Sequence, residues 1–300
     1  MNQIGFLGLG AIGTPMAQRI RTVAPLHVFD MDPAAIAQFG ECAGVASSPA
    51  DLASCVDILF NCLPSAEAHR RALLGAEGVL EGSRVEHVVN VGTTGPFLAR
   101  EIADVLATRR IETLGAAVSG GPHLARSGTL TTIASGALAS FELVRPLIET
   151  YSNKIYFVGV DIEQGQTMKL INNVLSAANL AIAAEALVTG ARAGLDPALM
   201  LEILNNGTGQ NSATSTKILR HVLPGTFDYG GRLQLVCKDL DEYLAKARSL
   251  SADTTLSDLV VALYHKAAQS EGVDSDMTCI VRPLEREAGV TLRESTRFDH

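Results

Sequence analysis

The chain has 300 residues, of which 47% are apolar and 19% are charged, and its formal net charge is −8. This composition excludes a disordered chain and predicts one large domain or two ordinary ones. A net acidic chain also argues against a nucleic-acid-binding surface or an anionic-membrane surface, so neither partner is expected.

The first half of the chain alternates apolar, β-branched runs with helical patterns. The strand-like runs are IGFLGLG, LHVFD, VDILFNC, VEHVVNV, IETLGAAV, LTTIAS and KIYFVG. Strands separated by helices predict a doubly wound, mostly parallel sheet with helices on both faces. We expect this α/β domain to occupy residues 1–161.

The pattern changes near residues 160–164, and the rest of the chain is expected to be all-helical. We predict helices over 165–193, 197–205, 213–222, 232–249, 256–271 and 276–288. Asp196 is a candidate N-cap before Pro197, and residues 292–300 are expected to fray. Residues 162–300 therefore form the predicted second domain, joined to the first by a long helix.

Targeting and redox signals favour a cytoplasmic protein. The five cysteines, at positions 42, 55, 62, 237 and 279, form no C-x-x-C pair and are expected to be reduced and mostly buried. No basic segment precedes an apolar one at the start, so no signal peptide is expected. The longest charge-free run, 170–184, is too short to span a bilayer.

GLGAIG places Gly8, Gly10 and Gly13 in G-x-G-x-x-G spacing between a predicted strand and a helix. In this context the first glycine permits the tight turn, the second lets the backbone approach a pyrophosphate, and the third permits close helix packing. We predict that this turn, with Ala11 and Ile12, binds a dinucleotide at the helix N-terminus. The alternative is an ordinary glycine-rich turn.

Asp30 ends the second predicted strand, 20 residues after Gly10. An acidic residue there accepts hydrogen bonds from the adenosine ribose and repels a 2′-phosphate. Met31, Asp32 and Pro33 supply no cation for such a phosphate, so NAD is favoured over NADP. The alternative is a turn residue that precedes the Pro33 helix.

Three other strand ends carry small or hydroxyl residues with backbone N–H groups. They are CLPSAEA, VGTTGP and AVSGGPHLARSGTL. Ligands of doubly wound sheets bind beyond the carboxyl ends of the strands, so together these loops favour a binding crevice. Ser119, Gly120 and Gly121 are the candidate carboxylate nest among them. Each loop alone is also compatible with turn chemistry.

Lys169 begins a helical run with no other charge until Glu185. At 3.6 residues per turn it shares a face with Asn172, Asn173 and Ser176. The amides can bind a polar ligand beside the ammonium, and a desolvated lysine can act as a general acid or base. The alternative is a lysine that extends its ammonium into water. No metal-ligand spacing or G-x-S-x-G motif occurs.

These motifs resemble, in order and spacing, those of the β-hydroxyacid dehydrogenases, which include 3-hydroxyisobutyrate dehydrogenases and tartronate semialdehyde reductases. The resemblance runs from about residue 2 to residue 290. The stretches that carry it are FLGLGAIGTPMA, CLPS, VSGG, GTL, GQTMKLINN and KDL. It implies an N-terminal Rossmann domain, a helical C-terminal domain, and reversible oxidation of the 3-hydroxyl of a short hydroxy acid.

The resemblance also implies residue roles. Lys169 matches the catalytic lysine that exchanges the hydroxyl proton. Ser119, Gly120 and Gly121 match the loop that binds the substrate carboxylate, and Asn173 matches the asparagine that orients substrate and lysine. The matches to cofactor-contacting positions are Leu63, Pro64, Thr93 and Lys238. A small hydroxy acid or semialdehyde substrate and a homodimer or homotetramer are expected.

The chain departs from the family pattern at three places. Asn90–Thr93 reads NVGT in place of Asp-x-Ser-Thr, Gly115 and Ala117 replace an Asp and a Pro, and Gly231 stands where Phe is common. These positions leave the substrate open. Two other functions remain possible: a dinucleotide-binding protein without turnover, and an imine reductase, although relatives of the latter kind often replace the lysine.

Overall fold

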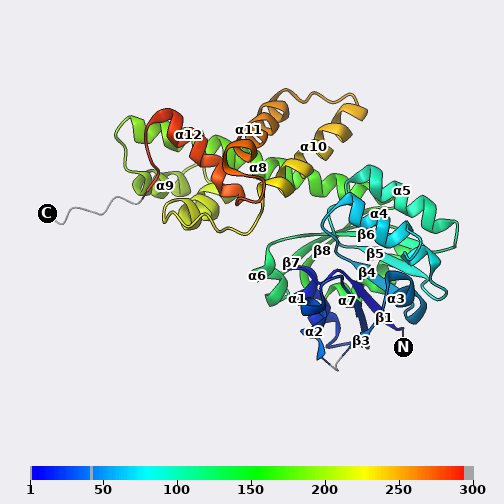
Figure 1. The fold of residues 1–300 in the computed structure, drawn as a ribbon. Coiled ribbons are helices and arrows are strands. Elements are labelled where there is room, and N and C mark those ends of the chain that lie inside the picture. The colour runs from blue at the N-terminus through cyan, green and yellow to red at the C-terminus, as the bar shows by residue number, and fades with distance from the viewer. Residues whose placement is uncertain (1, 41–42, 294–300) are drawn as a thin grey trace. The chain divides into compact units, whose positions relative to one another are not determined.

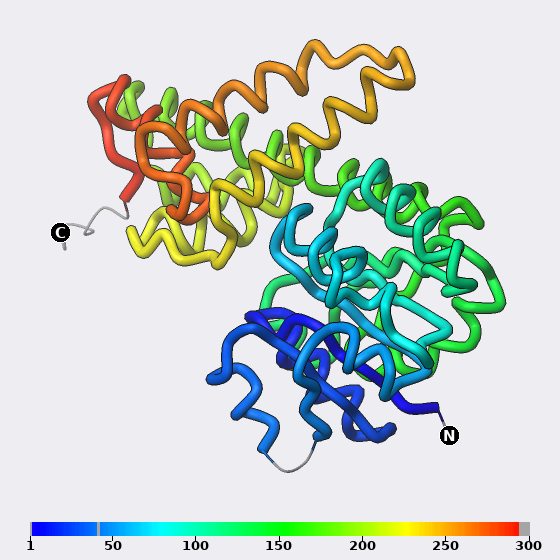
Figure 2. Tube along the Cα trace, turned by 45° about the vertical axis from the view of Figure 1, so that its right-hand side comes forward, coloured from blue at the N-terminus to red at the C-terminus, as the bar shows by residue number. Residues whose placement is uncertain are grey.

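The computed structural model describes residues 2–40 and 43–293, and the chain divides into two compact units between Lys169 and Leu170. Figures 1 and 2 show an α/β unit formed by the N-terminal part of the chain and a helical unit formed by the C-terminal part. Cys42 and residues 294–300 of the predicted frayed tail lie outside the described residues.

Within the described residues, the first unit is built on one eight-stranded sheet in the order β3-β2-β1-β4-β5-β6-β7-β8. The strands are β1 (Ile4–Leu7), β2 (Leu26–Phe29), β3 (Gly44–Val45), β4 (Ile58–Asn61), β5 (His87–Asn90), β6 (Glu112–Ser119), β7 (Leu130–Gly136) and β8 (Ser152–Gly159). Neighbouring strands are parallel except β6 and β7, which are antiparallel. The prediction of a mostly parallel α/β sheet is confirmed.

Helices cover both faces of this sheet (Figure 1). On one face the helices are α1 (Gly13–Ile20), α2 (Pro33–Ala37), α6 (Pro122–Ser127) and α7 (Leu138–Ile148). On the other face they are α3 (Pro49–Cys55), α4 (Ala66–Leu74) and α5 (Pro96–Ala107), with the 3-10 turn η2 (Val79–Glu81). Each face buries its own apolar cluster, so the strands are apolar on both sides, as parallel strands between helices require.

The strand order determines where a ligand can bind. β1, β4, β5 and β6 are consecutive and parallel, so their carboxyl ends lie at one edge of the sheet. The chain continues from β1 to β2 on one side and later returns to β4 on the other, which creates a switch point beside β1. The loops that the sequence singles out all begin at this edge.

The second unit is helical. Its elements are α9 (Pro197–Asn206), the π-helix η3 (Ala213–Val222), α10 (Leu233–Ser249), α11 (Thr255–Glu271), the 3-10 turn η4 (Met277–Ile280) and α12 (Val281–Ala288). α10 and α11 lie side by side as an antiparallel pair (Figure 2). The core gathers around the later turns of α8 (Ile162–Arg192), which contribute Ala177, Leu180 and Ala184.

Helix α8 has 31 residues, twice the length of its charge-free run. By length and composition it could cross a membrane, with a mean hydropathy of 1.6 over its most apolar window, and 44% of that window is buried inside the protein. A helix with apolar residues on all its faces is typical of a protein core. The packing of α8 in the second unit accounts for part of its apolar composition, whereas Leu175 and Ile182 of this helix stay exposed.

The four described cysteines are free thiols. Cys237 and Cys279 are buried, whereas Cys55 and Cys62 are only half-buried. The expectation of mostly buried thiols thus holds for two of these four. Cys55 is the last residue of α3, and Cys62 directly follows β4.

Candidate functional site

The glycine-rich turn has the three properties that a pyrophosphate-binding turn requires. Gly8 has φ +93°, and a Cβ there would lie 2.4 Å from the carbonyl oxygen of Cys62. A Cβ at Gly13 would lie 2.0 Å from the carbonyl oxygen of Gly8, so α1 can approach the turn only without a side chain. A Cβ at Gly10 would meet nothing within 4 Å, which leaves open space above this backbone. The turn, including Ala11 and Ile12, therefore fits a dinucleotide pyrophosphate.

Asp30 follows β2 and supports the same turn. Its Oδ2 accepts a hydrogen bond from the backbone N–H of Leu9 at 2.5 Å, and its Oδ1 accepts one from the N–H of Asp32 at 2.8 Å. Each carboxylate oxygen keeps a second lone pair for a ribose hydroxyl. The turn role that these bonds show is therefore compatible with the ribose role that the sequence predicts.

The loop after β4 lies against the glycine turn. The Leu63 side chain approaches to 3.1 Å of the position that a Cβ on Gly8 would take, whereas Pro64 is exposed. Ser65 then caps α4, because its hydroxyl accepts from the backbone N–H of Ala68 at 3.1 Å. The cap explains why a serine follows the proline in CLPS.

The loop after β5 carries Thr93 and is shaped by Asn90 and Thr94. Asn90 Nδ2 donates to the Thr94 hydroxyl at 3.0 Å, and Asn90 Oδ1 accepts from the N–H of Gly92 at 3.2 Å. An aspartate would offer no donor to Thr94 unless it were protonated. The NVGT departure thus forms a loop with its own internal hydrogen bonds, and Thr93 is half-buried within it.

The loop after β6 begins at Ser119 and enters α6 through two exposed glycines. Gly120 has φ +127°, which an L side chain rarely adopts, and Gly121 is the N-cap residue of α6. At the other end of α6, Arg19 of α1 donates to the carbonyl oxygen of Arg126 at 3.2 Å. The predicted carboxylate loop and the glycine-turn helix are therefore connected.

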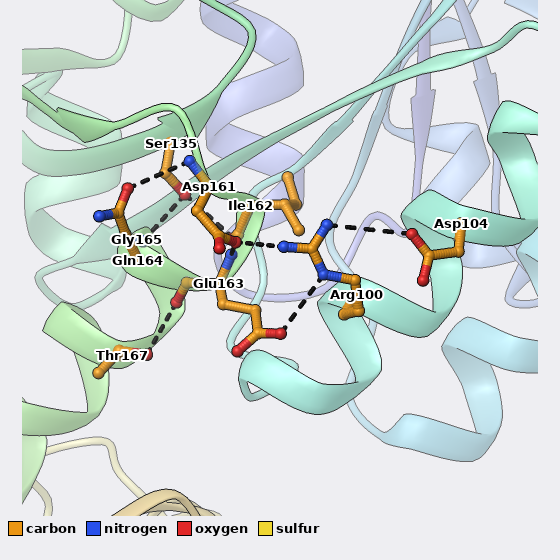
Figure 3. A network of polar contacts seen from close by, with 9 residues as sticks. All are labelled: Arg100, Asp104, Ser135, Asp161, Ile162, Glu163, Gln164, Gly165 and Thr167. Atoms are coloured by element: carbon orange, nitrogen blue, oxygen red, sulfur yellow. Dashed lines mark hydrogen bonds and ion pairs between the residues drawn. The ribbon is translucent and has the colours of Figure 1, made fainter. Parts of the chain in front are cut away.

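Helix α8 begins with a capping box. Asp161 Oδ1 accepts from the N–H of Glu163 at 3.0 Å, and Gln164 Oε1 accepts from the N–H of Asp161 at 3.1 Å. These reciprocal bonds satisfy the first N–H groups of the helix. Arg100 of α5 also pairs with Asp161 and Glu163, as Figure 3 shows. The pairs are partly exposed, so we attribute orientation rather than much stability to them.

The first turn of α8 then packs closely on β7. The Ser135 hydroxyl donates to the carbonyl oxygen of Ile162 at 3.0 Å and accepts from the N–H of Gly165 at 2.9 Å (Figure 3). A Cβ on Gly165 would lie 2.8 Å from that hydroxyl oxygen. Gly115 is adjacent, and a Cβ there would lie 3.4 Å from the same oxygen. The two glycines thus allow the helix to approach the sheet.

Gln166, one residue later, joins α8 to the loop after β5. This fully buried side chain donates through Nε2 to the carbonyl oxygen of Gly92 at 2.9 Å. Its Oε1 accepts from the N–H groups of Thr94 and Gly95 at 3.1 and 3.3 Å. Three bonds therefore fix this turn of the helix to the loop that carries Thr93.

Lys169 lies one helical turn after Gln166, and its side chain is buried, with 8% of its surface exposed. Because a residue at i+3 lies on nearly the same helix face, Lys169 follows the face that Gln166 fixes to the sheet edge. A buried ammonium can serve as a proton donor or acceptor whose balance its surroundings adjust. This burial argues against a lysine that extends its ammonium into water.

Asn173 and Lys238 meet through Asp239 in the second unit. Asn173 Nδ2 donates to Asp239 Oδ2 at 2.6 Å, and Lys238 Nζ lies 3.0 Å from Asp239 Oδ1. Asn172 Nδ2 donates to Asn173 Oδ1 at 3.1 Å. The aspartate of the KDL motif thus orients both a predicted substrate residue and a predicted cofactor residue.

Sequence reasoning missed the residues that hold the site together. Gln166 and Asp239 lie inside the quoted motifs GQTMK and KDL, but the motifs do not reveal which residues these two side chains contact. Ser135 and Arg100 had no signal in the sequence, because their partners are 27 to 63 residues away. At Gly231, a Cβ would lie 3.2 Å from the Met277 sulfur. Met277 therefore occupies part of the space that a Phe side chain at this position would need.

Both parts of the chain match known family models. Residues 3–159 match the family model for the NAD binding domain of 6-phosphogluconate dehydrogenase. Residues 164–284 match the model described as NAD-binding of NADP-dependent 3-hydroxyisobutyrate dehydrogenase.

Two curated relatives and one crystal structure align over nearly the whole chain. The chain is 30% identical to 2-(hydroxymethyl)glutarate dehydrogenase of Eubacterium barkeri, with 97% of each chain covered. It is 33% identical to 3-hydroxyisobutyrate dehydrogenase of Pseudomonas aeruginosa, with 91% of this chain and 96% of the relative covered. The structure of 3-hydroxyisobutyrate dehydrogenase from Salmonella typhimurium matches with a TM-score of 0.83 at 26% identity, covering 94% of this chain and 99% of that one. The chain belongs to the β-hydroxyacid dehydrogenase family, with an N-terminal Rossmann fold and a helical C-terminal part.

Proposed function

We propose that this protein transfers a hydride between NAD(P) and the 3-hydroxyl carbon of a short β-hydroxy acid, with Lys169 as the general acid/base. The observation that carries the proposal is the fixed position of Lys169. It is buried, and it lies one turn after Gln166, whose three hydrogen bonds hold the helix to the loop after β5. A general base must be held within reach of the proton that it takes.

The other residues divide between the two ligands. Residues 1–161 form the proposed dinucleotide-binding domain, and residues 162–300 the proposed substrate and oligomerisation domain. Ser119, Gly120 and Gly121 would bind the substrate carboxylate through hydroxyl and backbone N–H groups. Asn173, held by Asp239, would orient the substrate. The cofactor contacts would come from Gly8, Gly10, Ala11, Ile12, Gly13, Asp30, Leu63, Pro64, Thr93 and Lys238.

In the proposed reaction Lys169 takes the proton of the substrate hydroxyl during oxidation and returns it to the carbonyl oxygen during reduction. When bound, the nicotinamide ring accepts or supplies the hydride at the carbinol carbon. Burial of Lys169 limits exchange of its proton with bulk water, which keeps proton transfer directed at the substrate.

NAD is the proposed preference over NADP. Asp30 places a carboxylate at the end of β2, where it would repel a 2′-phosphate, and the next residues bring no cation. One of the matching family models is described for NADP-dependent enzymes, so the assay below compares the two cofactors directly.

A homo-oligomer in the cytoplasm is also proposed. Leu175 and Ile182 on α8 are 59% and 58% exposed, and Leu199 and Ile203 on α9 are 53% and 63% exposed. Several large, exposed apolar side chains on two consecutive helices are typical of a subunit interface. The free thiols fit a reducing compartment.

The experiment is a panel assay at 340 nm with NAD and NADP. The panel contains 3-hydroxyisobutyrate, 2-(hydroxymethyl)glutarate, threonate, glycerate and the matching semialdehydes or oxo acids. Turnover of at least one hydroxy acid, faster with NAD, supports the proposal. Binding of NAD without turnover of any member would favour a cofactor-binding protein, and turnover of imines alone would favour reductive amination.

A further inference from the structure

The helical unit contains a second buried lysine that has no role in the proposed reaction. Lys217 lies in the π-helix η3, and only 3% of its surface is exposed. Its Nζ donates to the Ser176 hydroxyl at 2.7 Å and lies 5.5 Å from the centre of the Tyr229 ring. Within the described part of the chain no carboxylate pairs with it, so this ammonium is buried without a counter-ion.

A buried cation without a counter-ion is unfavourable unless something compensates for its desolvation. An ammonium has three donors, and Lys217 directs one of them to Ser176, which leaves two without an acceptor among the described residues. Burial lowers the pKa of the Lys217 ammonium, as expected where no anion stabilises the charge. An anionic ligand would satisfy the two donors and restore the ordinary protonation.

The position of Ser176 indicates which anionic ligand would bind Lys217. Lys169, Asn173 and Ser176 follow one another at spacings of four and three residues on α8, so they share a face. Ser176 lies about 10 Å along the helix axis from Lys169, at 1.5 Å per residue. Asn173 and Ser176 are both partly exposed on this face. The Lys217 ammonium therefore joins the row of polar groups that begins at the proposed catalytic lysine.

The local backbone also differs from an ordinary helix. η3 is a π-helix of ten residues, a conformation that is rare and recurs at functional sites. Asn211 begins it by accepting the N–H groups of Ala213 and Thr214 at 2.8 and 3.2 Å. This geometry holds Lys217 toward Ser176 of α8 rather than toward solvent.

We infer that Lys217, together with Ser176, binds a second carboxylate of the substrate. The preferred substrates are then β-hydroxy acids that carry a second carboxylate at the end of a side arm, away from the hydroxyl group. This inference rests on the proposed function.

A matched pair of substrates tests the assignment. 3-Hydroxyisobutyrate and 2-(hydroxymethyl)glutarate share the hydroxymethyl group and the first carboxylate, and they differ in a methyl group against a carboxyethyl arm. Lys217→Met should lower kcat/KM for the dicarboxylate about 10- to 100-fold, as expected for a charge-assisted hydrogen bond, and change that for the monocarboxylate less than about twofold. Lys217→Arg should retain part of the preference. Lys266→Met, which removes an exposed lysine of the same unit, should change neither.

Two further measurements keep the outcomes separate. Thermal unfolding tests a purely structural role of Lys217. If Lys217 served only to bond Ser176, its replacement would lower the melting temperature without a selective loss of dicarboxylate turnover. Lys217→Gln is used in place of Lys217→Met if the methionine variant does not fold. If the wild type turns over neither substrate, the proposed function fails, and calorimetric titration with glutarate and butyrate still tests Lys217. Weaker binding of glutarate alone in Lys217→Met supports the inference. Equal losses for both ligands, or none, would overturn it.

Discussion

Gln166 donates a hydrogen bond from Nε2 to the carbonyl oxygen of Gly92 at 2.9 Å, across 74 residues of sequence. This bond and the two that Gln166 Oε1 accepts connect the helix of the buried lysine to a loop at the carboxyl edge of the sheet. A motif that reads as a lysine followed by asparagines thus depends on the glutamine that precedes them.

Replacing Gln166 should therefore affect both stability and turnover. Gln166→Ala leaves buried backbone N–H groups of Thr94 and Gly95 without an acceptor, so unfolding free energy should fall by about 2–3 kcal/mol. Release of the turn should lower kcat about tenfold or more. Denaturant unfolding and steady-state kinetics measure both effects. The control is Gln164→Ala, which removes a bond at the helix start, should cost about 1 kcal/mol and should spare kcat. Equal kcat losses in the two variants would show that the loop contact has no special role.

Two alanine substitutions in the glycine turn, each of which adds one methyl group, should separate its role in folding from its role in cofactor binding. Gly10→Ala places its Cβ in open space, so thermal stability should stay near that of the wild type while the Kd for NAD rises about tenfold or more. Gly13→Ala places its Cβ 2.0 Å from a backbone oxygen and should destabilise the fold by about 2–3 kcal/mol. Melting curves with and without NAD distinguish them. A stable Gly10→Ala protein that binds NAD normally would contradict the pyrophosphate assignment.

Asp30 should control the cofactor preference. Asp30→Asn removes the charge that repels a 2′-phosphate, so the ratio of kcat/KM for NADP to that for NAD should rise about tenfold, equivalent to about 1.4 kcal/mol. One backbone N–H also loses an acceptor, because Asp30 serves both Leu9 and Asp32, so stability should fall by about 1 kcal/mol. Asp104→Asn, on the exposed side of α5, serves as the charge control. An unchanged cofactor ratio in Asp30→Asn would remove the basis for the NAD preference.

Glu242 should make the stability of the protein depend on pH. Burial raises the pKa of its carboxyl to about 7, Lys238 opposes the rise, and Asp239 and Asp241 add to it. The folded state therefore holds a proton that the unfolded state has lost, so stability should fall as pH rises from about 4.5 to about 7.

Glu242→Gln should remove this slope. Above pH 7 the variant should be more stable than the wild type by about 1–2 kcal/mol, a value reduced because the side chain is partly exposed. Denaturant unfolding between pH 5 and pH 8 measures the difference. Glu185→Gln, at an exposed position of α8, should keep the wild-type slope. Parallel pH curves for the wild type and Glu242→Gln would show that Glu242 is ionised throughout.

Much of the fold follows from local patterns in the sequence. The helix predicted over 213–222 has those bounds in the structure, and the seven predicted strand runs each contain a strand. The pattern could not reveal that 213–222 is a π-helix, because apolar spacing hardly distinguishes it from an α-helix over ten residues. β3 was missed because its two residues, Gly44 and Val45, are too few to show an alternation. The antiparallel direction of β7 depends on the short connection through α6, which no periodicity records.

The site divides in the same way. Gly8, Gly10 and Gly13 were predictable because the G-x-G-x-x-G spacing lies within a single turn between a strand and a helix. The position of Asp30 predicts either a turn residue or a ribose ligand, and its bonds to Leu9 and Asp32 are compatible with both roles. The bonds of Asn173 to Asp239 and of Lys217 to Ser176 cross 66 and 41 residues, so only the folded chain brings these partners together.

The role of Lys169 is tested by single-turnover hydride transfer in Lys169→Ala, followed at 340 nm beside an NAD titration. We expect the rate of hydride transfer to fall about 10²- to 10⁴-fold, as for loss of a general acid/base, while the Kd for NAD changes less than about twofold. Hydride transfer at the wild-type rate in this variant would contradict the assignment of Lys169 as the general acid/base.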